Sequence, residues 1–158
     1  MSEEKIKFRN SCGAFATGIT VITSKFNDNI SGMTANGFMS VSLEPPLIAV
    51  SIGLKQNMHE TIMRSNVFGV SILDHNQENI SNHFAGKHNP DLQIEFSESN
   101  GIPYLTDNHA YFLAKVVSKH KEGDHTIFIG EVLEHGTNDK NTPLLFYKGN
   151  YKKINHKQ

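Results

Sequence analysis

The stretch GMTANGFMSVSLEPPLIAVSI, residues 32–52, decides how this chain folds. The end of this stretch overlaps LIAVSIG, residues 47–53, a nearly continuous apolar run that predicts a buried β-strand. Pro45 and Pro46 precede the run, and Pro46 can sit only at the strand entrance because proline has no N–H to donate to a sheet. Small and hydroxyl-bearing residues interrupt the strand predicted before it, which is typical of a place where a backbone or a flat ligand comes close.

Hydrophobic periodicity predicts further elements on both sides of this stretch. The expected strands are residues 19–26, 30–38, 47–53, 67–73, 109–121, 125–135 and 144–148. The expected helices are residues 5–16, 57–65 and 76–85, and the expected loops are residues 40–47 and 86–103. In the first helix the apolar face would bury Ile6, Phe8, Cys12 and Phe15, and Asn57 is the expected N-cap of the second.

Tight turns between consecutive strands, such as the predicted turn at residues 122–124, favour an antiparallel sheet. Six or more strands in so short a chain close most easily as a small barrel, since closure removes exposed edges. The length of 158 residues fits a single domain over residues 1–158.

Composition narrows the classes of partner. Fifteen basic and sixteen acidic side chains leave a net charge of −1, which argues against nucleic acid or an anionic membrane as the main partner. The charged start MSEEKIKFRN and the lack of a run of about 20 apolar residues predict a cytoplasmic protein. The single cysteine, Cys12, excludes an intrachain disulfide.

Several familiar site motifs are absent from the sequence. It contains neither G-x-G-x-x-G nor G-x-x-x-x-G-K-[ST], the dinucleotide and nucleotide phosphate motifs. His59-Glu60 begins like a zinc-protease helix, but Met63 stands where the second histidine would be, and we expect no metal site. The sequence contains no G-x-S-x-G nucleophile elbow, so no motif supports an esterase function.

Five segments, in order along the chain, resemble the flavin reductase-like family. They are FRNSCGAFATGITVIT at 8–23, the stretch at 32–52, Phe84-Ala85, GDHTIFIGEV at 123–132 and PLLFYKGNY at 143–151. The family has the FMN-binding split-barrel fold and includes the reductase components of two-component flavin monooxygenases. The resemblance implies a mainly β fold with flanking helices, built on a six-stranded antiparallel Greek-key split barrel.

The resemblance also implies an enzyme that transfers a hydride from NADH or NADPH to FMN or FAD, working as a homodimer with flavin at the subunit interface. A monooxygenase component that receives the reduced flavin is a further expected partner. His125 would orient the nicotinamide, and no residue is assigned to proton transfer. The implied cofactor-binding residues are Thr34, Ala35, Asn36, Ser40, Val41, Ser42, Ser51, Leu54, Lys55, Asn57, Phe84, Ala85 and His125.

Some alternatives stay open at the level of sequence. Residues 56–59 are QNMH where relatives often carry several Ser or Thr, so the phosphate contacts, and hence FMN versus FAD, are undetermined. The sequence does not distinguish NADH from NADPH, nor a retained flavin from a diffusing one. A flavin-binding electron carrier or storage protein without NAD(P)H oxidation is the alternative function.

Overall fold

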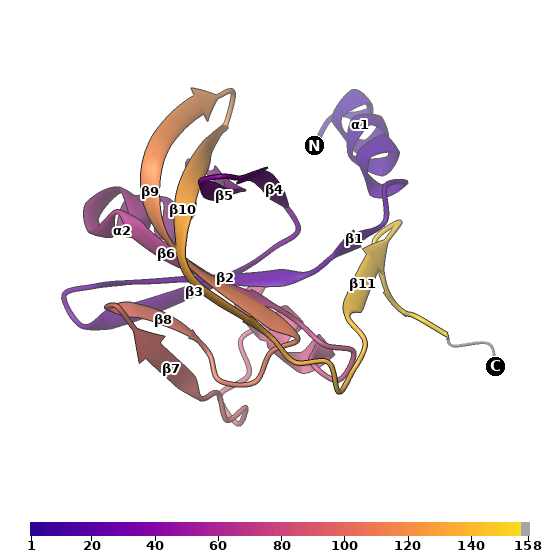
Figure 1. Ribbon diagram of the computed structural model, residues 1–158. Coiled ribbons are helices and arrows are strands. Elements are labelled where there is room, and N and C mark those ends of the chain that lie inside the picture. Colours follow the sequence, from indigo (N-terminus) through magenta and orange to yellow (C-terminus); the bar gives the residue numbers. More distant parts are fainter. Residues whose placement is uncertain (156–158) are drawn as a thin grey trace.

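The computed structural model describes residues 1–155, which form a mainly β structure with three flanking helices (Figure 1). In chain order the elements are α1 (Glu3–Gly13), β1 (Thr17–Gly18), β2 (Thr20–Phe26), β3 (Asn29–Ala35), β4 (Phe38–Leu43), β5 (Pro46–Gly53), α2 (Asn57–Ser65), β6 (Val67–Ile72), α3 (Glu78–Phe84), β7 (Phe96–Ser99), β8 (Ile102–Leu105), β9 (Ala110–Glu122), β10 (His125–Thr137), β11 (Leu144–Tyr147) and β12 (Asn150–Lys153). Among these residues, no helix is long and apolar enough to span a membrane.

The main sheet has the strand order β3-β2-β6-β9-β10-β5-β4, and every neighbouring pair is antiparallel. The predicted antiparallel sheet is confirmed, with seven strands instead of six. Its two end strands, β3 and β4, are joined only by Asn36 and Gly37. Because so short a link spans at most roughly 11 Å, the sheet must curl until its ends approach each other.

The two longest strands, β9 and β10, bend as they cross the molecule (Figure 1). Register shifts between Ile129 and Gly130 and between Val132 and Glu134 interrupt their pairing. Such irregularities bend a strand and increase its twist, which helps the sheet to curl.

Both faces of β2 are buried, since alternate side chains of a strand point to opposite faces. Ile22 lies in the larger apolar cluster with Val50, Phe68 and Phe128. Val21 lies in the smaller cluster, which includes Leu73, Leu105 and Leu144. The inner strand thus joins the two cores and holds β3, its neighbour at the sheet edge.

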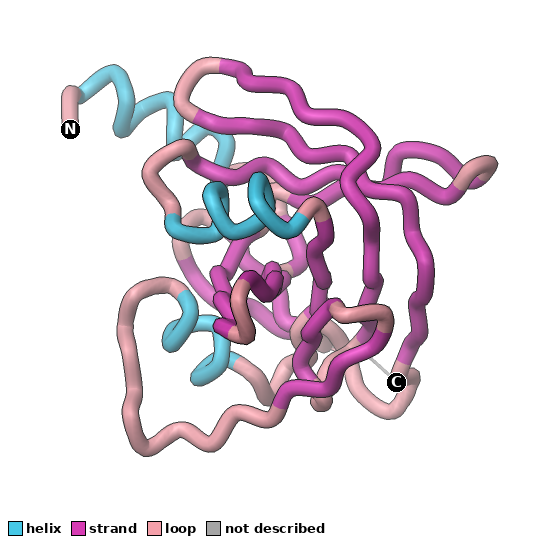
Figure 2. Tube along the Cα trace, turned by 90° about the vertical axis from the view of Figure 1, so that its left-hand side faces the viewer, coloured by secondary structure: helices cyan, strands magenta, loops and turns pink. Residues whose placement is uncertain are grey.

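Two helices lie beside the same pair of strands (Figure 2). Both α2 and α3 contact β2 and β3. The amphipathic helix α2 buries Met58 and Ile62 in the larger core and ends at Asn66, whose φ of 59° is the left-handed conformation of a helix end. Two smaller sheets, β1-β11-β12 and β7-β8, complete the fold.

The prediction for the first helix is wrong in its burial. It begins at Glu3, one residue after its cap Ser2, and no residue of α1 is buried. Phe8 is 71% exposed and Phe15 79% exposed, and Ile6 and Cys12 are also exposed. The physical reason is that α1 stands off the sheet (Figure 1), so nothing in the described chain covers its apolar side chains.

Other boundaries also differ from the predictions. The strand expected over 30–38 ends at Ala35, and the loop expected over 40–47 contains most of β4, which pairs with β5. Asn57 is the first residue of α2 rather than its cap, and Gln56 at the cap position makes no side-chain capping bond. The loop expected over 86–103 includes β7 and the start of β8.

Candidate functional site

A cleft of 1270 Å³ lies where the end of β3, the β5–α2 connection, the end of α3 and the β9–β10 turn meet. It contains segments that are far apart in the sequence. The lining residues are Ser31, Gly32, Met33, Thr34, Ala35, Asn36, Gly37, Ser51, Gly53, Leu54, Lys55, Gln56, Asn57, Met58, Phe84, Ala85, Gly86, Asp124 and His125.

One wall of the cleft is the edge strand β3. The Thr34 hydroxyl donates a hydrogen bond of 2.7 Å to the carbonyl of Ser81 in α3. The carbonyl of Ala35 accepts a bond of 2.7 Å from the Thr20 hydroxyl. These bonds hold the strand backbone in place while its end, Asn36, stays exposed.

Glycines let the walls of the cleft approach one another. A Cβ on Gly32 would lie 2.5 Å from Cε1 of Phe84, so only a residue without a side chain permits this packing. A Cβ on Gly37 would lie 3.2 Å from Cβ of Ser51, and the N–H of Ser51 donates 2.9 Å to the Gly37 carbonyl. At Gly32, inside the strand, the close neighbour is thus a side-chain ring, and the backbone approach predicted for this stretch occurs at Gly37, between β3 and β4.

The start of α2 carries positive charge toward the cleft. Lys55, Gln56 and Asn57 line the cleft, and no side chain caps the first turn of this helix. Backbone N–H groups at a helix start bear a partial positive charge, which suits a phosphate group. Among residues 1–155, Lys55 makes no ion pair, so its ammonium group adds a free charge at the same end.

Next to the β5–α2 connection, β10 begins with His125 directly across from Gly53 of β5. The N–H of Leu54 donates 2.9 Å to the carbonyl of Asp124, which fixes the β9–β10 turn against the β5–α2 connection. A Cβ on Gly53 would lie 3.8 Å from Nε2 of His125, so the imidazole edge borders the cleft.

Asp124 holds the imidazole of His125 by its other nitrogen. Nδ1 of His125 and Oδ1 of Asp124 are 2.7 Å apart. The hydrogen bond from His125, followed by the charge of its ring, lowers the pKa of the Asp124 carboxyl below its ordinary value of 3.8. The ionised carboxylate therefore orients the ring and leaves Nε2 available to a ligand.

The structure brings most of the predicted site residues to this cleft. Those that line it are Thr34, Ala35, Asn36, Ser51, Leu54, Lys55, Asn57, Phe84, Ala85 and His125. Ser40, Val41 and Ser42 do not line it; they lie on β4, which pairs with β5. A second hollow, of 600 Å³ and mainly apolar lining, reaches β4 at Met39 and shares Asn36, Gly37 and Ser51 with the cleft.

Sequence reasoning missed several residues of the cleft. Gly32, Met33 and Gly37 lie within the same decisive stretch, and their small or flexible side chains were a signal of close approach. Asp124 stands in the Gly-Asp-His motif directly before His125. Gln56 lies in QNMH, where the sequence departs from the family pattern, and no local signal marked it as a cleft residue.

The residues of the cleft fit a flavin mononucleotide unit. Gly32, Ala35 and Phe84 give the cleft a partly apolar wall, which suits an isoalloxazine ring. Asn36 and Ser51 add polar groups, and the start of α2 with Lys55 adds positive charge that suits a phosphate.

Comparison with known proteins agrees with this geometry. The family model described as "Flavin reductase like domain" matches residues 12–155. An NADH-dependent flavin reductase of Rhodococcus sp is 39% identical over 153 residues, covering 94% of this chain and 86% of that protein. NADH-dependent flavin reductase StyB of Pseudomonas fluorescens is 38% identical over 148 residues, covering 91% of this chain and 86% of StyB.

Solved structures of flavin reductases are also similar to this chain. The structure of flavin reductase PheA2 in its native state superimposes with a TM-score of 0.92 at 43% identity, covering 99% of this chain and 100% of that one. The Streptomyces globisporus NADH:FAD oxidoreductase SgcE6, with NAD and FAD fragments, has a TM-score of 0.88 at 31% identity and covers 97% of this chain and 94% of that one. The chain belongs to the flavin reductase-like family.

Proposed function

We propose that this protein is an NAD(P)H-dependent flavin reductase, which catalyses NAD(P)H + oxidised flavin → NAD(P)⁺ + reduced flavin. The observation that supports this most is the cleft, which brings together the uncapped start of α2, the Asp124–His125 turn and a wall that contains glycines. Relatives described as NADH-dependent flavin, FMN and FAD reductases support the same reaction.

Bound flavin supplies an electron-accepting ring, and the residues of this chain bind and orient the reactants. Asn36 and the backbone beside it would donate hydrogen bonds to the polar edge of the ring, where electron density increases on reduction. Lys55 and the first turn of α2 would hold the phosphate. His125, oriented by Asp124, would position the nicotinamide, since positioning rather than proton transfer is what hydride transfer needs.

The assignment of the individual site residues is part of this proposal. The binding residues would be Thr34, Ala35, Asn36, Ser51, Leu54, Lys55, Asn57, Phe84, Ala85 and His125 from one chain. Ser40, Val41 and Ser42 line neither the cleft nor the adjoining hollow, so they would contact flavin in a site completed by a second chain. We further propose that residues 1–158 act as one flavin reductase-like domain, consistent with the family match over 12–155.

A homodimer is also part of the proposal, and exposed apolar side chains support it. β4 is an edge strand whose Leu43 is 95% exposed, Met39 60% and Val41 42%. Together with Phe15 and the neighbouring hollow, they form an apolar face that borders the cleft. A second copy of this chain would cover that face and complete the wall of the flavin site.

Reduced flavin would pass to a separate monooxygenase. The relatives named as reductase components of 4-hydroxyphenylacetate and resorcinol hydroxylases support such a partner. The sequence expectation of a cytoplasmic protein belongs with this proposal, since the nicotinamide and flavin pools are there.

Anaerobic absorbance spectroscopy tests the reaction directly. Purified protein is titrated first with FMN or FAD and then with NADH or NADPH. The expected result is bleaching of the flavin absorbance at a rate that depends on the protein, with catalytic turnover when flavin is in excess. Tight flavin binding without nicotinamide oxidation would contradict a reductase and support an electron carrier or storage protein.

A further inference from the structure

The helix α3 contributes to the wall of the cleft, but its own sequence does little to fix its position. It is seven residues long, from Glu78 to Phe84, and no side chain caps its first turn. Isolated helices shorter than about 12 residues are marginal in water, so such a helix depends on other parts of the protein. The places of Phe84 and Ala85 in the cleft wall are therefore set by the contacts that α3 makes with other elements.

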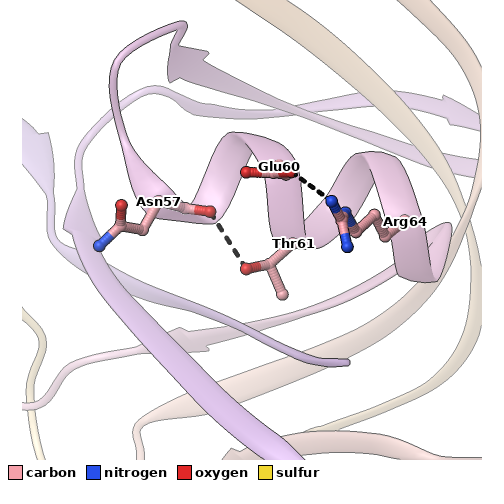
Figure 3. Close-up of polar contacts among 4 residues, drawn as sticks. All are labelled: Asn57, Glu60, Thr61 and Arg64. Carbon is pink, nitrogen blue, oxygen red and sulfur yellow. Dashed lines mark hydrogen bonds and ion pairs between the residues drawn. The ribbon is translucent and has the colours of Figure 1, made fainter. Parts of the chain in front are cut away.

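The other helix beside the cleft, α2, is held in a different way. It buries two apolar side chains in the larger core, and the polar contacts drawn in Figure 3 stay within the helix. The Thr61 hydroxyl donates 3.1 Å to the carbonyl of Asn57. Nη2 of Arg64 donates 2.7 Å to Oε1 of Glu60. In α3 the one buried residue is Ser81, which is polar, so polar bonds to other elements matter more for its position.

The phenol of Tyr151, on β12, bonds to two residues of α3. Its hydroxyl donates 2.9 Å to Oδ1 of Asn82 and lies 2.8 Å from Oγ of Ser81. Because the phenol proton goes to Asn82, the Ser81 hydroxyl must be the donor in the second bond. Ser81 is 1% exposed, so water cannot replace this partner. The Tyr151 ring packs against the smaller core, with its centroid 5.8 Å from that of Phe146.

From Ser81 and Asn82 the hydrogen bonds continue to the cleft. The carbonyl of Ser81 is among the last four of α3, which lack a partner within the helix, and it accepts the 2.7 Å bond from the Thr34 hydroxyl. The carbonyl of Asn82 accepts from the N–H groups of Ala85, at 3.2 Å, and Lys87, at 3.0 Å. Thr34 and Ala85 both line the cleft. One pair of bonds to α3 thus reaches the cleft wall at two places.

We propose that Tyr151 is a positioning residue of the flavin site, which holds α3 so that Thr34 and Ala85 keep their places at the cleft. Tyr151 does not line the cleft, and it acts through Ser81 and Asn82. The β11–β12 hairpin, which belongs to a different sheet from β3, thereby takes part in shaping the site. This inference rests on the proposed flavin site.

Tyr151→Phe removes the hydroxyl and keeps the ring. Calorimetric titrations with FMN and with FAD, at a temperature where the variant is folded, should show flavin binding about tenfold weaker than in the unsubstituted protein. The visible circular dichroism of bound flavin should change as well, because it reports the surroundings of the ring. A residue that only stabilised the fold would lower the midpoint of thermal unfolding and leave both flavin readouts unchanged.

A second measurement does not need flavin. Hydrogen exchange of backbone amides, followed by NMR, should become about tenfold faster at Ala85 and Lys87 in the Tyr151→Phe variant, because their acceptor Asn82 is held less firmly. The amide of Ser51, which bonds to a carbonyl outside α3, should exchange at an unchanged rate.

Tyr147→Phe is the matched control. Tyr147 lies on β11 of the same hairpin, and among residues 1–155 its hydroxyl makes no hydrogen bond. This variant should leave flavin affinity and amide exchange unchanged. If Tyr151→Phe does not fold, Ser81→Ala removes one of the two bonds from the side of the helix and should produce the same effects at smaller size.

A double variant tests whether Tyr151 acts through α3. Thr34→Val removes the bond between β3 and Ser81, so its effect on flavin affinity and that of Tyr151→Phe should together be smaller than their sum.

Three results would overturn the assignment while leaving the flavin reductase function intact. They are unchanged flavin affinity in Tyr151→Phe, equal effects of Tyr151→Phe and Tyr147→Phe, and full additivity with Thr34→Val. Failure of flavin to bind to the unsubstituted protein would instead refute the proposed function. In that case unchanged amide exchange at Ala85 and Lys87 in Tyr151→Phe would still refute the role of Tyr151.

Discussion

At the scale of single residues, the cleft depends on a contact between a glycine and an aromatic ring. Gly32 of β3 faces Phe84, which α3 places at the cleft wall. The ring is held from other sides, with its centroid 4.9 Å from that of His83 and 6.3 Å from that of Phe96. Phe84 therefore cannot move freely to accept a new side chain, and the shape of the wall depends on Gly32.

We expect Gly32→Ala to lower the free energy of unfolding by about 1–3 kcal/mol, because its methyl group would overlap the Phe84 ring. Flavin affinity should fall as well, since the ring lines the cleft. Thermal denaturation and flavin titration measure the two effects. Gly18→Ala is the matched control, because a Cβ at Gly18 would meet no atom within 4 Å. Equal stability of the two variants would contradict this account of the wall.

His125 and Asp124 allow a prediction about acid titration. The folded-state pKa of Asp124 is lowered, so its interaction with His125 is present above the ordinary carboxyl pKa of 3.8 and is lost as pH falls through the lower folded value. In His125→Ala the pKa of Asp124 should rise toward 3.8, as followed by carbon NMR of the carboxyl. Lys5→Ala removes the last and smallest of the causes and should raise it less.

The same His125→Ala variant should raise the apparent KM for the nicotinamide while leaving flavin affinity nearly unchanged. The reason is that the imidazole edge borders the cleft at the β9–β10 turn, where it would contact the nicotinamide rather than hold the flavin. Steady-state kinetics at varied NADH, together with flavin titration, measure both quantities. An equal loss of the two would refute the role assigned to His125.

At the scale of elements, α2 is tied to the strand that begins with His125. Nε2 of His59 lies 2.7 Å from the hydroxyl of Thr126, and the His59 ring packs 5.5 Å from Phe128 between centroids. Thr126 is only 4% exposed, so water cannot replace its partner. The helix whose start lines the cleft and the strand that begins with His125 are thus held in a fixed relation.

Thr126→Val keeps the volume and removes the hydroxyl, leaving the ring nitrogen of His59 without its partner. We expect a loss of about 1–3 kcal/mol in the free energy of unfolding, measured by chemical denaturation. Ser118→Ala provides the comparison, because it removes a hydroxyl that makes a solvent-exposed contact of 3.2 Å with Nε2 of His120 on the same strand, β9. The free energy of unfolding of the Ser118→Ala variant should be nearly unchanged. If both variants lost a similar free energy of unfolding, the contact between α2 and β10 would have no special role in stability.

At the scale of the whole molecule, one side of the chain remains apolar and uncovered. The edge strand β4 carries Leu43 and Met39 outward, and Phe15 follows the exposed helix α1. An exposed sheet edge with apolar side chains is unfavourable in a monomer. The hollow beside this edge shares residues with the cleft. A second chain that covered the edge would therefore also complete the proposed flavin site.

Leu43→Glu should therefore convert the proposed dimer to a monomer and weaken flavin binding in parallel, because a carboxylate cannot be buried there without a partner. Sedimentation velocity and flavin titration measure the two quantities across protein concentrations. Met63→Glu places the same charge on the exposed part of α2 and should leave both unchanged. A Leu43→Glu protein that remains dimeric would exclude β4 from the interface.

The sequence by itself determined the mainly β, antiparallel class and most of the strands. Local alternation and turn residues carry that information, as at residues 47–53, which became β5 from Pro46 to Gly53. The motif of residues 32–52 also marked a site, through small residues that local propensity does not favour in a strand.

Only the tertiary structure decided which residues meet. The seven-strand order places β3 and β4 at opposite ends of the hydrogen-bonded sheet although two residues link them. Ser40–Ser42 do not line the cleft, whereas the pairing of β10 with β5 brings Asp124 and Gly53 into it. The burial expected for α1 failed because Ile6 and Phe8, two residues apart, point to nearly opposite sides of a helix, so its apolar side chains do not form one face that could be buried.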